Sequence, residues 1–167
     1  MLAAAACAAA PGPLCAQLFG NDTEKELEER NWIEGAIKLP AFPRRGDLVE
    51  FDAGSATSFQ FFIDGKSLSI GDDGVIRYTL IARSQSGAES VSYEGMRCKT
   101  GMYRVYALGH SDGSWRERPS DWKPIDPWKA SVWHRSLRRE FFCPHNEPIH
   151  SVEEGLKALR LGRNPKL

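Results

Sequence analysis

VSYEGMRC, residues 91–98, combines a tyrosine, a glutamate, an arginine and a cysteine in one short stretch. It lies between two runs of branched and aromatic residues, VIRYTLIAR and MYRVYALG. Such runs favour β-strands, and the SQSG and KTG segments that separate them favour hairpin turns. We therefore expect three adjacent antiparallel strands, which bring polar side chains from all three onto one face of a sheet.

The loop lengths set the register of these strands. With a four-residue SQSG loop and a three-residue KTG loop, Glu94 lies between Arg77 and Tyr106. Arg104 is then diagonal to Glu94. This row is a candidate site for a small anionic or polar ligand, with Glu94 holding the arginines in place. A purely structural cross-strand salt bridge is the alternative, and it is the commoner arrangement.

The same register sorts the side chains into two faces. The expected core face carries Ile76, Tyr78, Leu80, Val91, Tyr93, Tyr103, Val105 and Ala107. The expected polar face carries Arg77, Thr79, Ser92, Glu94, Met96, Cys98, Arg104 and Tyr106. Both loops give the same division, and a slip by one residue would mix polar and apolar side chains on each face.

Catalysis is the weaker interpretation of these residues. Glu94 as a general base, or His134 nearer the C-terminus, would suit a small periplasmic hydrolase or isomerase if a pocket shifted its pKa. The sequence shows no nucleophile–base pair, phosphate-binding loop or metal-ligand spacing. We therefore assign no catalytic residue and expect no metal and no cofactor.

Composition limits the partners. The 167 residues suit a single domain, and 22 basic side chains balance 22 acidic ones, which gives no support for nucleic-acid binding. The charge is uneven, because residues 17–35 are mainly acidic and residues 116–139 mainly basic. The basic region would suit an anionic envelope polymer or lipid headgroups, although charged helix faces are usually just solvated.

The N-terminus, MLAAAACAAAPGPLCAQ, is typical of a secretory signal peptide cut after Ala16. An alanine-rich tail is the alternative, and Pro11 and Pro13 interrupt the run too early for a transmembrane segment. The mature chain is thus expected in the periplasm, and outer-membrane association stays open. Its two remaining cysteines, Cys98 and Cys143, are expected to form a disulfide.

The pattern along the chain predicts an α+β fold. After the signal peptide 1–16, residues 17–46 hold an acidic helix (21–35) and a proline-containing connector, and residues 47–167 form a single domain. That domain is expected to contain a curved antiparallel meander of about six strands with C-terminal helices packed on it. Ala130, Trp133, Leu137 and Phe141 form the apolar stripe of a helix expected to start at Pro127, and Ser151 with Glu154 cap a second helix.

A longer stretch, GDDGVIRYTLIARSQSGAESVSYEGMRC, is followed by YALG, DGSW, a late tryptophan and FFC. This set resembles the cryptic neisserial protein-like family of exported beta-proteobacterial proteins, over about residues 32 to 143. The resemblance implies a periplasmic or envelope location and carries no activity. We expect an envelope protein that binds rather than catalyses, with an envelope protein, a polymer or a small anionic ligand as its partner.

Overall fold

The computed structural model describes residues 29–54, 57–128 and 131–167. By its contacts the chain divides into two compact units, residues 1–33 and 34–167. The first unit is described only at its end, where Glu29 and Arg30 are helical. The expected signal peptide and most of the expected acidic helix therefore lie outside the described residues. Every strand that the structure describes belongs to the second unit, which begins at Glu34.

An antiparallel sheet of eight strands forms the second unit. Its strands are β1 (Leu48–Phe51), β2 (Gln60–Asp64), β3 (Ser69–Ile70), β4 (Val75–Arg83), β5 (Glu89–Arg97), β6 (Met102–Gly109), β7 (Trp115–Glu117) and β8 (Lys123–Pro124). The order is β1-β2-β4-β5-β6-β7, with β3 also paired to β4 and β8 to β6. The α+β class and the meander are confirmed, with two strands more than the six expected.

The C-terminal part supplies the helices. They are α2 (Val132–Ser136), the π-helical turn η2 (Leu137–Phe142) and α3 (Val152–Leu161), with short 3₁₀ turns at η1 (Arg45–Asp47) and η3 (Pro144–Asn146). The first helix begins at Val132, not at Pro127 as expected. Ser151 accepts a hydrogen bond from Glu154 N–H, and Gly162 ends α3 in the left-handed conformation, as helix capping requires.

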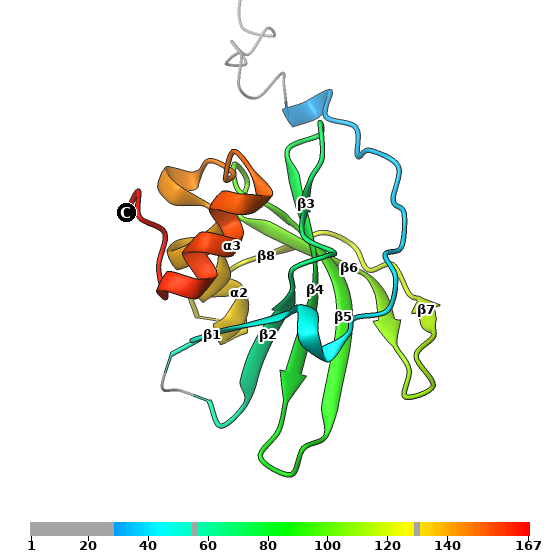
Figure 1. The fold of residues 1–167 in the computed structure, drawn as a ribbon. Coiled ribbons are helices and arrows are strands. Elements are labelled where there is room, and N and C mark those ends of the chain that lie inside the picture. The colour runs from blue at the N-terminus through cyan, green and yellow to red at the C-terminus, as the bar shows by residue number, and fades with distance from the viewer. Residues whose placement is uncertain (1–28, 55–56, 129–130) are drawn as a thin grey trace, which may run out of the picture. The chain divides into compact units, whose positions relative to one another are not determined.

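The sheet is covered on both faces. The C-terminal helices lie against one face, where Leu137, Phe141 and Phe142 complete the main hydrophobic core. We call this the helix face. Across the other face runs an irregular N-terminal segment, residues 34–44, which we call the strap (Figure 1). The strap covers a smaller apolar cluster around Tyr93 and Tyr106, with Leu39 packed against it.

The register of β5 differs from the expected one. Arg83 pairs with Glu89, so the loop between β4 and β5 runs from Ser84 to Ala88 and is one residue longer than assumed. Tyr78 therefore pairs with Glu94, while Arg77 pairs with Gly95. The predicted pairing of Arg77 with Glu94 is wrong, because the longer loop shifts β5 by one residue and exchanges its two faces.

A second irregularity lies between β5 and β6. Tyr93 pairs with Ala107 as expected, but Glu94 pairs with Val105, so Tyr106 is an extra residue in a β-bulge. The predicted pairing of Glu94 with Tyr106 is therefore also wrong. The two irregularities compensate, so that the faces of β4 and most of β6 are as predicted and only β5 is inverted.

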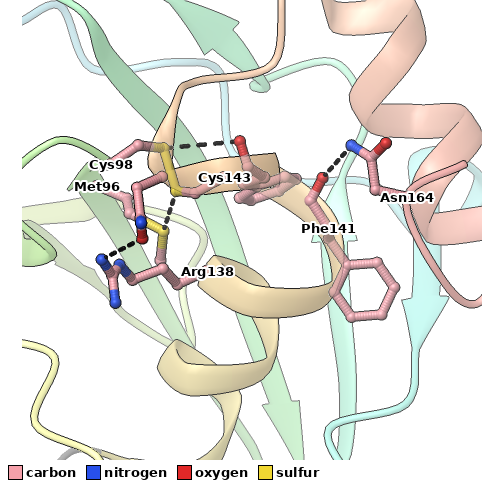
Figure 2. The surroundings of a disulfide bond; sticks show 8 residues. Met96, Cys98, Arg138, Phe141, Cys143 and Asn164 are labelled. Atoms are coloured by element: carbon pink, nitrogen blue, oxygen red, sulfur yellow. Dashed lines mark hydrogen bonds between the residues drawn. A yellow bond between two sulfur atoms is a disulfide. The ribbon is translucent and has the colours of Figure 1, made fainter. Parts of the chain in front are cut away.

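The disulfide between Cys98 and Cys143 is confirmed. It joins the end of β5 to the turn after η2, and both cysteines are buried in the main core. Figure 2 shows Cys143 beside Met96, with their sulfur atoms 3.7 Å apart, and Asn164 donating to the Phe141 carbonyl at 3.0 Å. The C-terminal helices are thus tied to the sheet covalently and by buried contacts.

Replacing both cysteines, Cys98→Ala with Cys143→Ala, should lower the free energy of unfolding by about 4 kcal/mol on the chain-entropy model. The reason is that the bond closes a loop across a sequence separation of 45 residues. Urea unfolding followed by tryptophan fluorescence measures the difference. A loss below about 1 kcal/mol would mean that the helices hold to the sheet without the bond.

Candidate functional site

The structure separates the four residues of the predicted site. Arg77, Arg104 and Tyr106 lie on the strap face of the sheet, where all three contact the strap. Glu94 points to the helix face, where it contacts Tyr78 and His134. Two polar clusters therefore stand in place of one row. We call them the strap cluster and the buried cluster.

Glu34, the first residue of the compact unit, provides the carboxylate of the strap cluster. It pairs with Arg104 and accepts a hydrogen bond from the Tyr106 hydroxyl at 2.6 Å. Arg77 Nη2 lies 3.9 Å from the same carboxylate. The Glu34 side chain is only 14% exposed, so these interactions are partly shielded from water.

Asp73 holds the second arginine of the strap cluster. Its two carboxylate oxygens accept hydrogen bonds from Arg77, at 3.1 and 2.6 Å, in the bidentate arrangement that matches the guanidinium fork. The backbone N–H groups of Gly35 and Val75 also donate to it. Burial would raise the pKa of Asp73, but these hydrogen bonds outweigh it and keep that pKa below its usual value.

Tyr106 can lie in this cluster because Gly95 has no side chain. A Cβ atom at Gly95 would stand 2.2 Å from the Tyr106 hydroxyl, far inside contact distance. Burial, followed by the hydrogen bond to the Glu34 carboxylate, raises the pKa of Tyr106. The phenol therefore stays protonated and acts as a donor. The glycine of VSYEGMRC thus makes room for an aromatic ring on the strap face.

The strap cluster is balanced in charge. Two arginines meet two carboxylates from the chain itself, so the site already holds the anionic groups that a small ligand would have to replace. Both guanidinium Nε atoms, of Arg77 and Arg104, are buried and have no hydrogen-bond partner among the described residues. The two arginines of the strap cluster bind a carboxylate, and Glu34 supplies that carboxylate.

The buried cluster surrounds Glu94 with three donors. Ser92 donates to one carboxylate oxygen at 2.6 Å, and Tyr78 donates to the other at 3.2 Å. His134 Nε2 lies 2.8 Å from that second oxygen. Burial and the nearby Glu94 carboxylate raise the pKa of Tyr78 well above its usual value, so this hydroxyl remains a donor.

His134 reaches Glu94 from α2 and stacks on the Tyr103 ring, with the ring centroids 3.7 Å apart. Glu94 and His134 are each only 3% exposed. The described cavities along β1 and the strap are lined by other residues. The pairing and burial of Glu94 and His134 fit a structural hydrogen-bond network. They count against the alternative in which either residue serves a hydrolase or isomerase.

We also searched the described part of the chain for metal-binding groups and membrane-spanning helices. There, no group of three or more His, Cys, Asp or Glu side chains could hold a metal ion. Of the helices described, none has the length and apolar character needed to cross a membrane.

Sequence reasoning missed Glu34 and Asp73 as site residues. Asp73 belongs to the GDDG turn, and its spacing of four residues from Arg77 was a usable signal. Glu34 had no such signal, because it meets Arg104 across a separation of 70 residues and comes from a segment without regular structure.

A protein-family model described as CNP1-like family matches residues 27–160. The chain belongs to the CNP1-like family. This confirms the resemblance expected from the GDDG to FFC motifs. Cryptic neisserial protein 1 of Neisseria gonorrhoeae is 31% identical over 120 residues, which cover 62% of this CNP1-like chain and 59% of that protein. The chain therefore spans 59% of the length of this curated relative, and no solved structure matches it.

Removing the strap carboxylate should detach the strap of this CNP1-like protein. We expect Glu34→Ala to lower the free energy of unfolding by about 2 kcal/mol, because the partly buried Arg104 and the buried Tyr106 lose a charged acceptor. Hydrogen exchange of the Trp115 indole N–H, which donates to the Pro40 carbonyl at 2.9 Å, should become faster. Sodium acetate should restore part of the lost stability, and sodium chloride at equal ionic strength should not. No change in stability or exchange would show that Glu34 does not hold the strap.

Removing the Glu94 carboxylate should destabilise the fold more than removing Glu34, and added acetate should not restore the stability. We expect Glu94→Ala to lower the free energy of unfolding by about 3 kcal/mol or more, because it leaves the buried donors on Tyr78 and His134, and the partly buried Ser92 hydroxyl, without an acceptor. Acetate should not help, since the space is closed to solvent, which makes this variant the matched control for Glu34→Ala. Urea unfolding measures both effects, and a loss under about 1 kcal/mol would contradict the structural role.

Proposed function

We propose that this CNP1-like chain is an exported protein of the bacterial cell envelope that acts by binding a partner and not by catalysis. The observation that carries the proposal is the Cys98–Cys143 disulfide in the core. Structural disulfides persist in oxidising compartments such as the periplasm and are rare in the cytosol. The alanine-rich start of the chain, with its expected cleavage after Ala16, supports the same location.

The two polar clusters support binding over catalysis. A catalytic acid or base needs access to substrate, but Glu94 and His134 are buried and bonded to each other. The arginines of the strap cluster are bonded to Glu34 and Asp73, so they already have their counter-ions. The groups that remain free to interact lie on the surface, which favours a protein or polymer partner over a small ligand.

Exposed basic side chains of residues 116–139 offer such contacts. Arg116, Arg118 and Lys123 are exposed, and the Arg139 side chain is 76% exposed. Exposed cations of this kind attract anionic polymer or headgroups in a salt-dependent way. If this attraction holds the protein at the envelope, high salt should release it from envelope fractions.

Cell fractionation tests the proposal directly. The full chain, produced in a Gram-negative bacterium, should appear in the periplasmic or envelope fraction with its N-terminus at Gln17. Its Cys98 and Cys143 should resist alkylation by a maleimide until they are reduced, because they are joined before the cells are broken. A full-length protein with both thiols reactive in the cytoplasmic fraction would overturn the proposed location.

A further inference from the structure

The strap is attached to the sheet through side chains. Gly35 N–H donates to the Asp73 carboxylate at 2.7 Å, and the Pro40 carbonyl accepts from the Trp115 indole N–H at 2.9 Å. Among the described residues, no backbone–backbone hydrogen bond joins residues 34–43 to the sheet. A strand would form a ladder of such bonds, whereas proline-containing peptides bind to grooves mainly through side-chain contacts.

A row of aromatic rings receives the apolar part of the strap. The ring centroids of Tyr93 and Tyr106 are 5.5 Å apart, and those of Tyr93 and Trp115 are 6.3 Å apart. We call these three rings the strap groove. Leu39 packs against them, and the Phe42 ring lies 5.2 Å from the Trp115 ring. Aromatic-lined grooves are the usual binding sites for extended peptides that contain proline.

The sequence of the strap suits such a groove. Residues 39–43 read LPAFP, with a proline after each of the two apolar residues that pack on the groove, Leu39 and Phe42. A proline fixes its own φ angle and restricts the residue before it to an extended backbone. The segment therefore loses less conformational entropy when it docks than an unrestricted segment would.

The strap carboxylate uses only part of the strap cluster. Glu34 bonds Arg104 and the Tyr106 hydroxyl, but Arg77 Nη2 lies 3.9 Å away, beyond hydrogen-bond distance. Arg77 is 6% exposed, and its Nε atom, like that of Arg104, is buried without a hydrogen-bond partner among the described residues. A carboxylate that also bonds Arg77 would therefore bind better than Glu34 does.

The strap is loosely packed. Residues 35–38 and Ala41 are exposed. A cavity of about 240 Å³ is lined by residues 40–42 of the strap and by residues 64, 66 and 67 beside it, so the strap does not fill the adjoining space. Segments with few buried contacts and exposed backbone open at a lower free energy than the core does.

We propose, in a step that rests on the binding function above, that the strap is an internal ligand covering a peptide-binding groove. An extended segment of a partner protein binds there when the strap opens. It carries a carboxylate for Arg77 and Arg104 and, five residues further on, a Leu-Pro pair followed by an aromatic residue, which are the anchors of the strap itself. A small anion brings only the first of these contacts, whereas such a peptide restores every contact that it displaces. With the strap closed, partners meet only the exposed surface.

Fluorescence anisotropy of a labelled synthetic peptide, IEGAIKLPAFPR (residues 33–44), tests the groove. The peptide is added to the oxidised full chain and to a strap variant, Glu34→Ala with Phe42→Ala, which weakens both ends of the strap. The strap variant should bind the peptide at least about tenfold more tightly than the wild type does, because its groove is open in a larger fraction of molecules. Peptides that carry Glu34→Ala or Phe42→Ala should each bind the strap variant about tenfold more weakly.

Substitutions in the protein locate the bound carboxylate. Arg104→Ala, added to the strap variant, should remove the preference for the Glu34 peptide over its alanine form, whereas Arg139→Ala, which changes an exposed arginine, should keep it. If a variant shows no cooperative unfolding in urea, the preference of the wild type between the two peptides decides alone.

Two results would overturn the proposal. One is the absence of binding to the strap variant at about 1 mM peptide. The other is equal binding of the Glu34 peptide and its alanine form. Neither result depends on the compartment, so a failure here leaves export of the protein untouched, and a cytoplasmic location would leave the peptide result standing.

Discussion

One extra residue in β6 divides the polar groups of this protein between two faces. Val105 pairs with Glu94 and Ala107 with Tyr93, which leaves Tyr106 between them without a partner on β5. In a regular ladder that begins at Tyr93 and Ala107, Glu94 would pair with Tyr106 and Met96 with Arg104, which would place both β6 side chains on the helix face. The β4–β5 register already places Glu94 under the helices, and the bulge shortens the β5–β6 register by one residue, so that Tyr106 lies with Tyr93 on the strap face.

Each face then needs its own compensation for buried charge. Under the helices, Glu94 is a carboxylate at low dielectric, and three hydrogen-bond donors from β4, β5 and α2 replace its lost hydration. On the strap face the bulge leaves Arg104 and Tyr106 beside Arg77 without the glutamate of β5. The strap supplies Glu34 in its place, and the strap's apolar residues cover the ring cluster around Tyr93. The irregular segment before β1 is thus part of the folded unit because the sheet's charges require it.

The sequence reveals the features of this fold that depend on local pattern. Runs of branched and aromatic residues locate β4 to β6, and the Ser151–Glu154 spacing locates the start of α3. Register depends on single residues that pattern does not mark: the loop after Arg83 holds one residue more than its SQSG motif suggests, and nothing in MYRVYALG marks a bulge. A disulfide could be predicted because only two cysteines remain after the expected cleavage, whereas Glu34 could not be linked to Arg104 through loops of unknown path.

The charges of the strap cluster and the buried cluster are paired within the chain, and this limits where the protein can bind a partner. A ligand for Arg77 and Arg104 would have to displace Glu34 and break the Tyr106 bond at 2.6 Å, and a ligand for His134 would have to open the core. The outward edge of β1 carries no such cost, because no described strand pairs with it. Glu50 and Arg160 are likewise exposed, and neither forms an ion pair among the described residues. Binding by this member of the CNP1-like family is therefore least costly at its strand edge and charged surface, and the two polar clusters serve to hold the sheet in the shape that presents them.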